Sequence, residues 1–241
     1  MSAAFSGPDN TGKTKQIGIL ARRMGPAATS AGPLDLYDPR WAAIKADGMA
    51  RWWFETGPVE EVADVLATSY LERSRRPFSA PVRLVDRGIP MLEASVAATA
   101  AVREDLGAAR AADRARLLLA PYETDLRTAE EGEHALVLLH CDDPEEGTRR
   151  SLAHEVTVTE IYAAYQRHLH EQINRLVDDG RFPMSRDPRI PRPAHPRRHP
   201  GLPADRTRPP ARTDQARREP GPALVDRHLL HHRVDAPLSS W

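Results

Sequence analysis

Apolar and polar positions along residues 1–182 follow a pattern that is typical of an α/β protein. Short apolar runs have the length and composition of strands in a parallel sheet, and they lie at 3–6, 81–88 and 134–141. Segments with helical spacing of apolar residues separate or follow them, at 14–24, 38–57, 58–76, 90–131 and 157–180. Because strands alternate with helices, the sequence predicts an α/β fold with a parallel sheet flanked by helices.

Glycine, proline and capping residues predict where these elements begin and end. We expect Gly25 to end the first helix, residues 26–40 to form a loop, and Gly107 to divide 90–131 into two helices. Pro58 suits the first turn of the helix at 58–76. The run Asp-Pro-Glu-Glu at 143–146 is typical of a helix start. Thr159 and Gly180 suit the two ends of the last helix.

The composition changes sharply near Phe182. Residues 183–241 hold 12 of the 22 prolines, with 12 arginines and 6 acidic residues, so they carry +6 while residues 1–182 carry −6. Proline at this density excludes helices and central strands. We therefore divide the chain into a domain at 1–182 and a disordered Pro/Arg-rich tail at 183–241.

Two other readings of this tail remain open. It could be the product of out-of-frame translation of a GC-rich gene, or a basic arm for nucleic acid. It lacks lysine and has few aromatic residues to stack on bases, so nucleic acid is not an expected partner.

The sequence contains no segment that suggests a membrane or a secretory route. It has no run of about 18 apolar residues, and residues 1–10 lack the pattern of a signal peptide. Cys141 is the single cysteine, which excludes a disulfide framework. We expect a cytoplasmic protein without a membrane partner.

The stretch "FSGPDNTGKTKQ" at 5–16 matches the phosphate-loop pattern G-x-x-x-x-G-K-[ST]. The loop would consist of Gly7, Pro8, Asp9, Asn10, Thr11, Gly12, Lys13 and Thr14. In such a loop, backbone N–H groups surround phosphate oxygens. Lys13 would reach the β- and γ-phosphates, and the Thr14 hydroxyl would bind Mg²⁺. The alternative is a polar turn that matches by chance, but the expected strand, loop and helix favour the phosphate loop.

Further candidate residues follow the other two expected strands. Asp86 could bind Mg²⁺ or its waters, and Arg87 could bind a substrate phosphate. Arg149 and Arg150 follow the third strand and could close over a nucleotide. The alternatives are a salt bridge at the strand end for Asp86 and Arg87, and a solvated helix face for Arg149 and Arg150.

Three segments together resemble the thymidylate kinase group of P-loop nucleoside monophosphate kinases. They are "FSGPDNTGKTKQ", "LVDRG" and "LVLLHCDDPEEGTRRSLAHE…YAAYQ", within roughly residues 3–180. The resemblance implies ATP and Mg²⁺ as cofactors and a small nucleotide as substrate, and it leaves a homodimer open. It also implies that Asp9 contacts the 3′-hydroxyl of the monophosphate, that Arg87 binds its phosphate, and that Arg149 and Arg150 bind the donor phosphates.

The chain departs from that group mainly on the acceptor side. Lys15 replaces a threonine, Gly88 stands where tyrosine is usual, and no Arg-Glu-Pro segment follows a second strand. The segment "LDLYDPRWAAIKADGMARWWFE" at 34–55 takes that region, and its tryptophans could form core or an acceptor pocket wall.

We therefore expect ATP-dependent phosphoryl transfer to a nucleoside monophosphate or a related small acceptor. For an alcohol acceptor, Asp86 would be the base. The alternatives are a non-catalytic NTP-binding protein, and an interaction protein whose tail is the active part.

Overall fold

The computed structural model of the chain describes residues 1–138, 143–153 and 159–182. The predicted tail at 183–241 lies outside the described residues, as do positions 139–141 of the third expected strand and 157–158 of the last expected helix.

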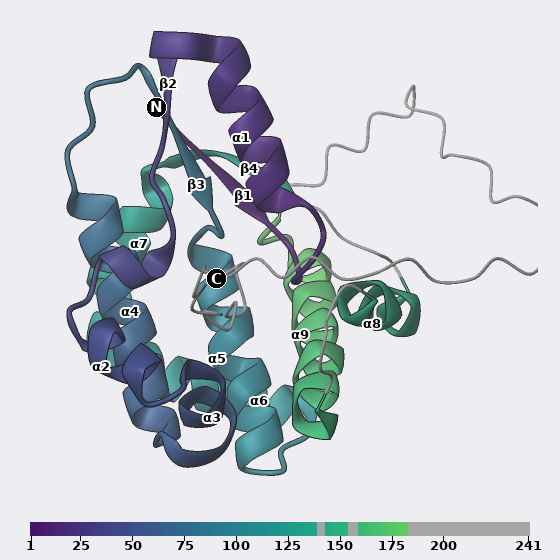
Figure 1. Ribbon diagram of the computed structural model, residues 1–241. Coiled ribbons are helices and arrows are strands. Elements are labelled where there is room, and N and C mark those ends of the chain that lie inside the picture. The colour runs from purple at the N-terminus through teal and green to yellow at the C-terminus, as the bar shows by residue number, and fades with distance from the viewer. Residues whose placement is uncertain (139–142, 154–158, 183–241) are drawn as a thin grey trace, which may run out of the picture. The chain divides into compact units, whose positions relative to one another are not determined.

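The described strands form one parallel sheet in the order β2-β3-β1-β4 (Figure 1). The strands are β1 (Ser2–Ser6), β2 (Ala28–Ser30), β3 (Val82–Asp86) and β4 (Glu133–Leu138). In the register of the sheet, Phe5 of β1 lies beside Asp86 of β3 and Val137 of β4. The carboxyl ends of these strands therefore meet at one edge. The prediction of an α/β fold with a parallel sheet flanked by helices is confirmed.

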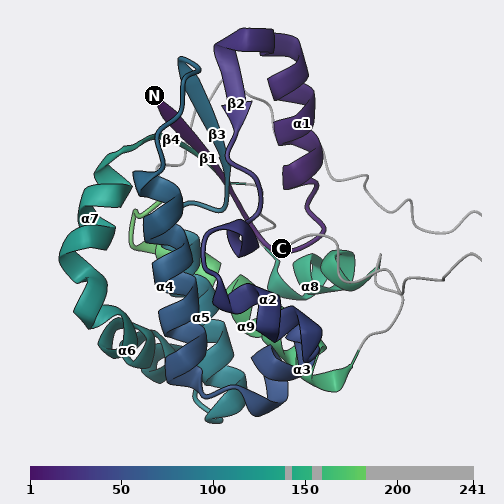
Figure 2. The ribbon, with the colours of Figure 1, turned by 60° about the vertical axis from the view of Figure 1, so that its left-hand side comes forward.

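Helices cover both faces of this sheet. They are α1 (Lys13–Met24), α2 (Arg40–Ala46), α3 (Met49–Arg51), α4 (Val59–Arg75), α5 (Ile89–Arg103), α6 (Ala108–Leu119), α7 (Glu123–Glu131), α8 (Pro144–Leu152) and α9 (Glu160–Asp178). Helix α1 lies on one side of the sheet, and α4 and α7 lie on the other (Figure 2). Ile17 of α1 packs with Phe5 and Leu84, which point to the same face of the sheet.

The larger hydrophobic core lies among the helices, with α5 at its centre. Most residues of α5 are buried, and the helix packs against α4, α6 and α9. Many of its core residues are alanines, such as Ala97, Ala98 and Ala101, whose small side chains let neighbouring helices approach closely. Trp53 and Tyr165 add large buried rings to this core.

Three local predictions were wrong. The expected loop at 26–40 contains the edge strand β2, which is only three residues long and has no apolar alternation, so its pairing with β3 decides its conformation. The expected helix at 38–57 is broken at Gly48, whose φ of 94° is left-handed, and it ends in a π-helical turn at Trp52–Thr56. Residues 90–131 form three helices, because a 3₁₀ turn containing Pro121 adds a second break.

Most predicted helix ends are confirmed. Gly25 and Gly180 adopt positive φ angles of 53° and 73° at the ends of α1 and α9. The Asp143 side chain accepts a hydrogen bond from the Glu145 N–H, and that of Thr159 accepts one from the Tyr162 N–H. Within the described ranges, no helix is both long enough and apolar enough to cross a bilayer.

Candidate nucleotide-binding site

The loop that joins β1 to α1 lies at the carboxyl edge of the sheet, as the phosphate-loop interpretation requires. Its backbone turns sharply, with positive φ at Gly7 (137°), Asn10 (58°) and Gly12 (84°). Gly12 precedes α1 and has no side chain that could cap the N–H groups that open this helix. An anion at this point would meet backbone N–H donors and the positive end of the helix dipole.

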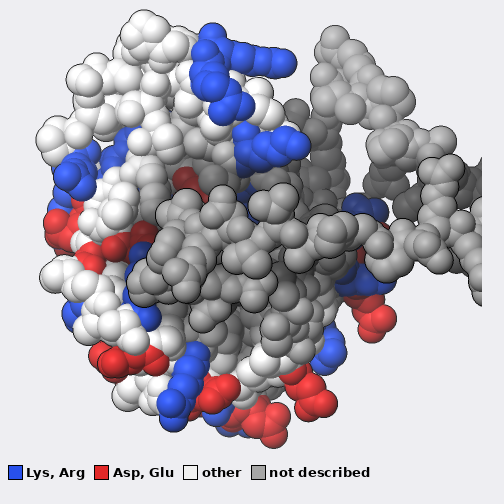
Figure 3. Space-filling view, in the orientation of Figure 1, with Lys and Arg blue, Asp and Glu red and all other residues white. Residues whose placement is uncertain are grey.

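Helix α1 itself is strongly basic. It carries Lys13, Lys15, Arg22 and Arg23, and none of its twelve residues is acidic. Figure 3 shows Lys and Arg side chains, without acidic neighbours, at the top of the drawn face where α1 lies in Figure 1. Lys13 and Lys15 add positive potential beside the loop, whereas Arg22 and Arg23 lie in the last turn, at the far end of the helix.

The side chain of Lys13 is buried inside the loop. It is 5% exposed, and its Nζ donates to the carbonyl of Pro8 and lies 3.4 Å from the Thr11 hydroxyl. The pKa of Lys13 is lowered to about 8, mainly by burial and also by the nearby charge of Arg87, while the charges of Asp9 and Asp86 act in the opposite sense. The Pro8 carbonyl and the Thr11 hydroxyl thus contact the ammonium group that would otherwise bind a phosphate.

Thr14 and Asp86 meet where α1 begins and β3 ends. The Thr14 hydroxyl donates to Oδ2 of Asp86 at 3.1 Å. Oδ1 of Asp86 is buried and has no hydrogen-bond partner among the described residues. A hydroxyl and a carboxylate are hard oxygen ligands of the type that Mg²⁺ prefers when phosphate oxygens and water complete its shell. The described part of the chain holds no group of three or more His, Cys, Asp or Glu side chains placed for a metal.

Asp9 and Arg87 form a buried ion pair directly behind the loop. Their side chains are 4% and 6% exposed, and the guanidinium donates to Oδ1 of Asp9. Arg87 has a φ of 61°, and its backbone N–H is held by the carbonyl of Phe5 at 2.8 Å. The two residues that were expected to bind the acceptor thus neutralise each other, and an acceptor phosphate would compete with Asp9 for Arg87.

Side chains of α8 and α9 complete this cluster, and the sequence pattern predicted no role for them. Gln166 donates to Oδ2 of Asp9 at 2.6 Å, and Tyr162 donates to the same oxygen at 3.3 Å. The Ser151 hydroxyl donates to the Asp9 carbonyl at 2.9 Å, and the Asn10 amide donates to the Ser151 carbonyl at 2.6 Å.

A sequence signal for part of this cluster did exist. Tyr162 and Gln166 are four residues apart, so both fall on the buried face of α9. A glutamine at a fully buried helix position indicates a polar partner inside the fold.

Arg149 and Arg150 lie on the exposed side of α8. Their side chains are 72% and 68% exposed, and both form ion pairs with Glu146 of the same helix. The opposite side of α8 packs closely against α9. At Gly147 there is no space for a side chain, because a Cβ there would lie 2.3 Å from Cε1 of His170. The solvated helix face was one of the two interpretations of these arginines, and it describes their present position.

The tryptophans near the expected acceptor region belong to the core. Trp41 and Trp53 are buried, and their indole N–H groups donate to Ser69 and Thr99 at 2.9 Å. The cavity between them and Arg87 has a volume of about 20 Å³, enough for little more than one water. A nucleobase would need these side chains to move.

The comparisons with known proteins add no family to this picture. No protein-family model matches the chain, and no curated protein matches its sequence.

Proposed function

We propose that the chain is an ATP- and Mg²⁺-dependent kinase that transfers a phosphoryl group to a nucleoside monophosphate or a related small acceptor. The observation that carries the proposal is the contact between Thr14 and Asp86, beside a glycine-framed loop with a buried lysine at its end. This constellation joins the end of β3 to the start of α1, as phosphoryl-transfer sites of this type require.

The residues would divide the work as follows. Backbone N–H groups at Gly12–Thr14 and the ammonium of Lys13 would bind the ATP phosphates. Thr14 and Asp86 would hold Mg²⁺, which supplies charge neutralisation on those phosphates. An oxygen of the acceptor phosphate would attack the γ-phosphorus, and the bond to the β,γ-bridging oxygen would break with release of ADP. Because that acceptor is already an anion, the protein mainly positions the reactants and offsets their charge.

The acceptor side needs a rearrangement in this proposal. The acceptor phosphate would take the place of Asp9 on the guanidinium of Arg87, and Asp9 would keep its bonds from Gln166 and Tyr162. The arginines of α8 would have to exchange Glu146 for the donor phosphates.

The second candidate is a non-catalytic NTP-binding protein. The closed pair of Asp9 and Arg87 and the cavity of only about 20 Å³ beside it favour this alternative, because they leave no space for an acceptor. The donor side would then bind ATP in the same way, without turnover.

One experiment separates the two candidates. ATP consumption and ATP affinity are measured with Mg²⁺ against a panel of deoxy- and ribonucleoside monophosphates. Lys13→Ala should abolish binding and turnover, whereas the matched change Lys15→Ala, at an exposed position of the same helix, should preserve both. Binding without turnover on any acceptor would favour the non-catalytic protein. Equal ATP binding by the wild-type and Lys13→Ala chains would refute the phosphate loop.

A further inference from the structure

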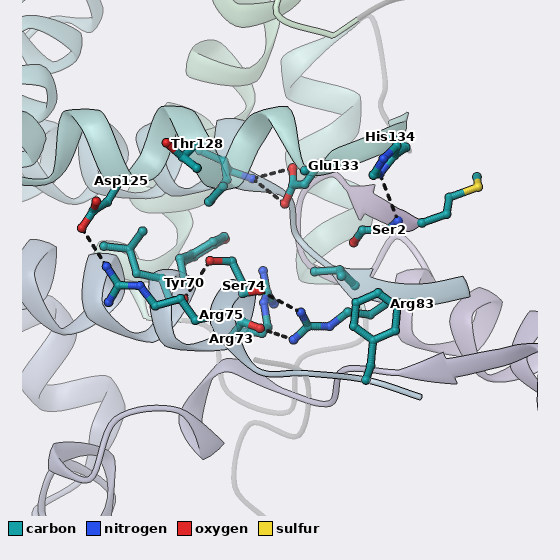
Figure 4. Close-up of a pocket in the computed structure, with 17 residues that line it drawn as sticks. Ser2, Tyr70, Arg73, Ser74, Arg75, Arg83, Asp125, Thr128, Glu133 and His134 are labelled. Atoms are coloured by element: carbon teal, nitrogen blue, oxygen red, sulfur yellow. Dashed lines mark hydrogen bonds and ion pairs between the residues drawn. The ribbon is translucent and has the colours of Figure 1, made fainter. Parts of the chain in front are cut away.

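A second cavity lies at the opposite end of the sheet from the phosphate loop. Its volume is about 370 Å³, and it is bounded by the last turns of α4, by β3, by α7 and by the start of β4 (Figure 4). The residues that line it include Ser2, Arg83 and Glu133, near the amino ends of their parallel strands, and none of the described lining residues belongs to Gly7–Thr14. The cavity is therefore separate from the proposed ATP site.

Two buried arginines give this cavity its chemistry. Arg73 and Arg83 are 2% and 5% exposed, and Figure 4 shows both beside the space that the lining residues enclose. Arg73 donates to the carbonyls of Asp86 at 2.6 Å and Arg87, and Arg83 donates to those of Ser74 at 3.3 Å and Arg73. These bonds use four of the ten N–H groups that two guanidinium groups carry.

No carboxylate neutralises either arginine directly. Among the described residues, no Asp or Glu oxygen lies within ion-pair distance of Arg73 or Arg83. Backbone carbonyls offer hydrogen bonds but carry no net charge, and burying an uncompensated charge is costly. The third arginine of the lining, Arg75, already has carboxylate partners in Glu72 and Asp125.

Two acidic residues line the opposite wall, Asp125 and Glu133; Asp125 pairs with Arg75, and Glu133 offsets the charge of Arg73 and Arg83 only in part. Its two carboxylate oxygens accept hydrogen bonds from the backbone N–H of Ile89, at 3.0 and 3.2 Å. Burial raises the pKa of Glu133 to about 7, although the Ile89 N–H and the charge of Arg73 act to lower it. Even when ionised, Glu133 carries one negative charge against the two positive charges of Arg73 and Arg83, so the cavity keeps excess positive charge.

We propose that this cavity is a second binding site, for a small phosphomonoester. Two guanidinium groups with spare N–H donors match the charge and the several oxygens of a phosphate dianion. The walls also supply apolar surface from Leu71, Phe78 and Val85 for the organic part of the ligand. The volume of about 370 Å³ falls in the range of small-molecule sites.

The same cavity side chains hold the turn that carries the candidate catalytic residues. Arg73 binds the carbonyls of Asp86 and Arg87, and Glu133 binds the N–H of Ile89, two residues after Arg87. Arg87 has left-handed backbone, a conformation that needs such support in a residue with a Cβ. A phosphate that binds Arg73 from the cavity would therefore change the hydrogen bonds that hold the turn at Asp86 and Arg87.

The test is calorimetric titration of the full chain carrying Lys13→Ala, which removes the lysine of the loop, so no ATP turnover is needed. Binding of an ester at Arg87 instead would persist in the cavity variants below, which separates the two sites. The probes are inorganic phosphate, glycerol phosphate, phenyl phosphate and, as a carboxylate control, succinate. We expect one phosphate ester to bind per chain, more tightly than succinate, and to slow amide hydrogen exchange in residues 70–75 and 82–89.

Three further variants locate the site. Arg83→Gln should weaken binding of the ester at least about tenfold, which corresponds to about 1.4 kcal/mol. Thr128→Trp fills the cavity from an exposed wall position of α7 without removing an arginine, and it should weaken binding similarly even if Arg83→Gln fails to fold. The matched control Arg110→Gln changes an exposed arginine of α6 and should leave binding unchanged.

Three results would overturn the proposal. They are absence of binding at millimolar ester, tighter binding of succinate than of any ester, and full binding after Thr128→Trp. All three are independent of kinase activity, so they would not be confused with failure of the proposed function.

Discussion

Asp9→Asn would leave the guanidinium of Arg87 buried without the carboxylate that pairs with it. Both side chains are almost fully buried, at 4% and 6% exposure. Removing one partner of such a pair typically costs about 3–5 kcal/mol, since the remaining charge stays out of water. Asp86 also stabilises the charge of Arg87, so we expect the lower end, about 3 kcal/mol. For a domain of this size, that lowers Tm by about 6–12 °C.

The partner substitution has a smaller expected cost. In Arg87→Met, Asp9 keeps the hydrogen bonds donated by Gln166 and Tyr162, so we expect about 2 kcal/mol. The double variant Asp9→Asn/Arg87→Met removes both charges and should cost less than the sum of the two single changes, by at least about 2 kcal/mol.

Urea unfolding of the four proteins, followed by circular dichroism, gives this coupling energy. The matched control is Glu123→Gln in the exposed pair of Glu123 and Arg127, whose side chains are both 68% exposed. It should change stability by less than about 0.5 kcal/mol. Additive single costs, each below about 1 kcal/mol, would show that the buried pair does not form in solution.

Three further predictions concern titration and backbone conformation. The Lys13 pKa is about 8 in the folded chain against 10.5 unfolded, so stability should rise with pH between those values, and Lys13→Met should flatten that rise in pH-dependent urea unfolding. The Glu133 pKa is raised from 4.5 to about 7, so the free energy of unfolding should fall as pH increases across that window. If Glu133→Gln showed the same fall, the fall could not come from Glu133. A Cβ at Gly12 would meet no atom within 4 Å, but the φ of 84° at this position disfavours alanine, so Gly12→Ala should cost about 1 kcal/mol of stability and weaken ATP binding. The control Gly18→Ala, inside α1, should raise stability by a similar amount in thermal unfolding.

The positions of most elements could be predicted from the sequence because hydrophobic spacing reports local burial. The runs at 3–6 and 81–88 became β1 and β3, and the amphipathic pattern before Gly180 became α9. The contact between Thr14 and Asp86 could also have been predicted from the sequence. Both follow strands of a parallel sheet, and the carboxyl ends of neighbouring parallel strands share one edge.

Elements with weak patterns could not be predicted in this way. The strand β2 has three residues, and its hydrogen bonds to β3 stabilise it rather than any apolar alternation of its own. The break at Pro121, by contrast, could have been predicted, because proline lacks the N–H that a helix interior needs; only the break at Gly107 was expected.

The sequence by itself therefore determined the α/β class, the loop at Gly7–Thr14 and the candidate residues at the end of β3. Only the tertiary structure decided which groups these residues contact. It pairs Asp9 with Arg87, brings Gln166 to Asp9 across 157 positions, and places Arg73 and Arg83 around a cavity at the other end of the sheet. The reason is physical: spacing along the chain shows that a position is buried, but the partner of a buried charge is set by the packing of distant segments.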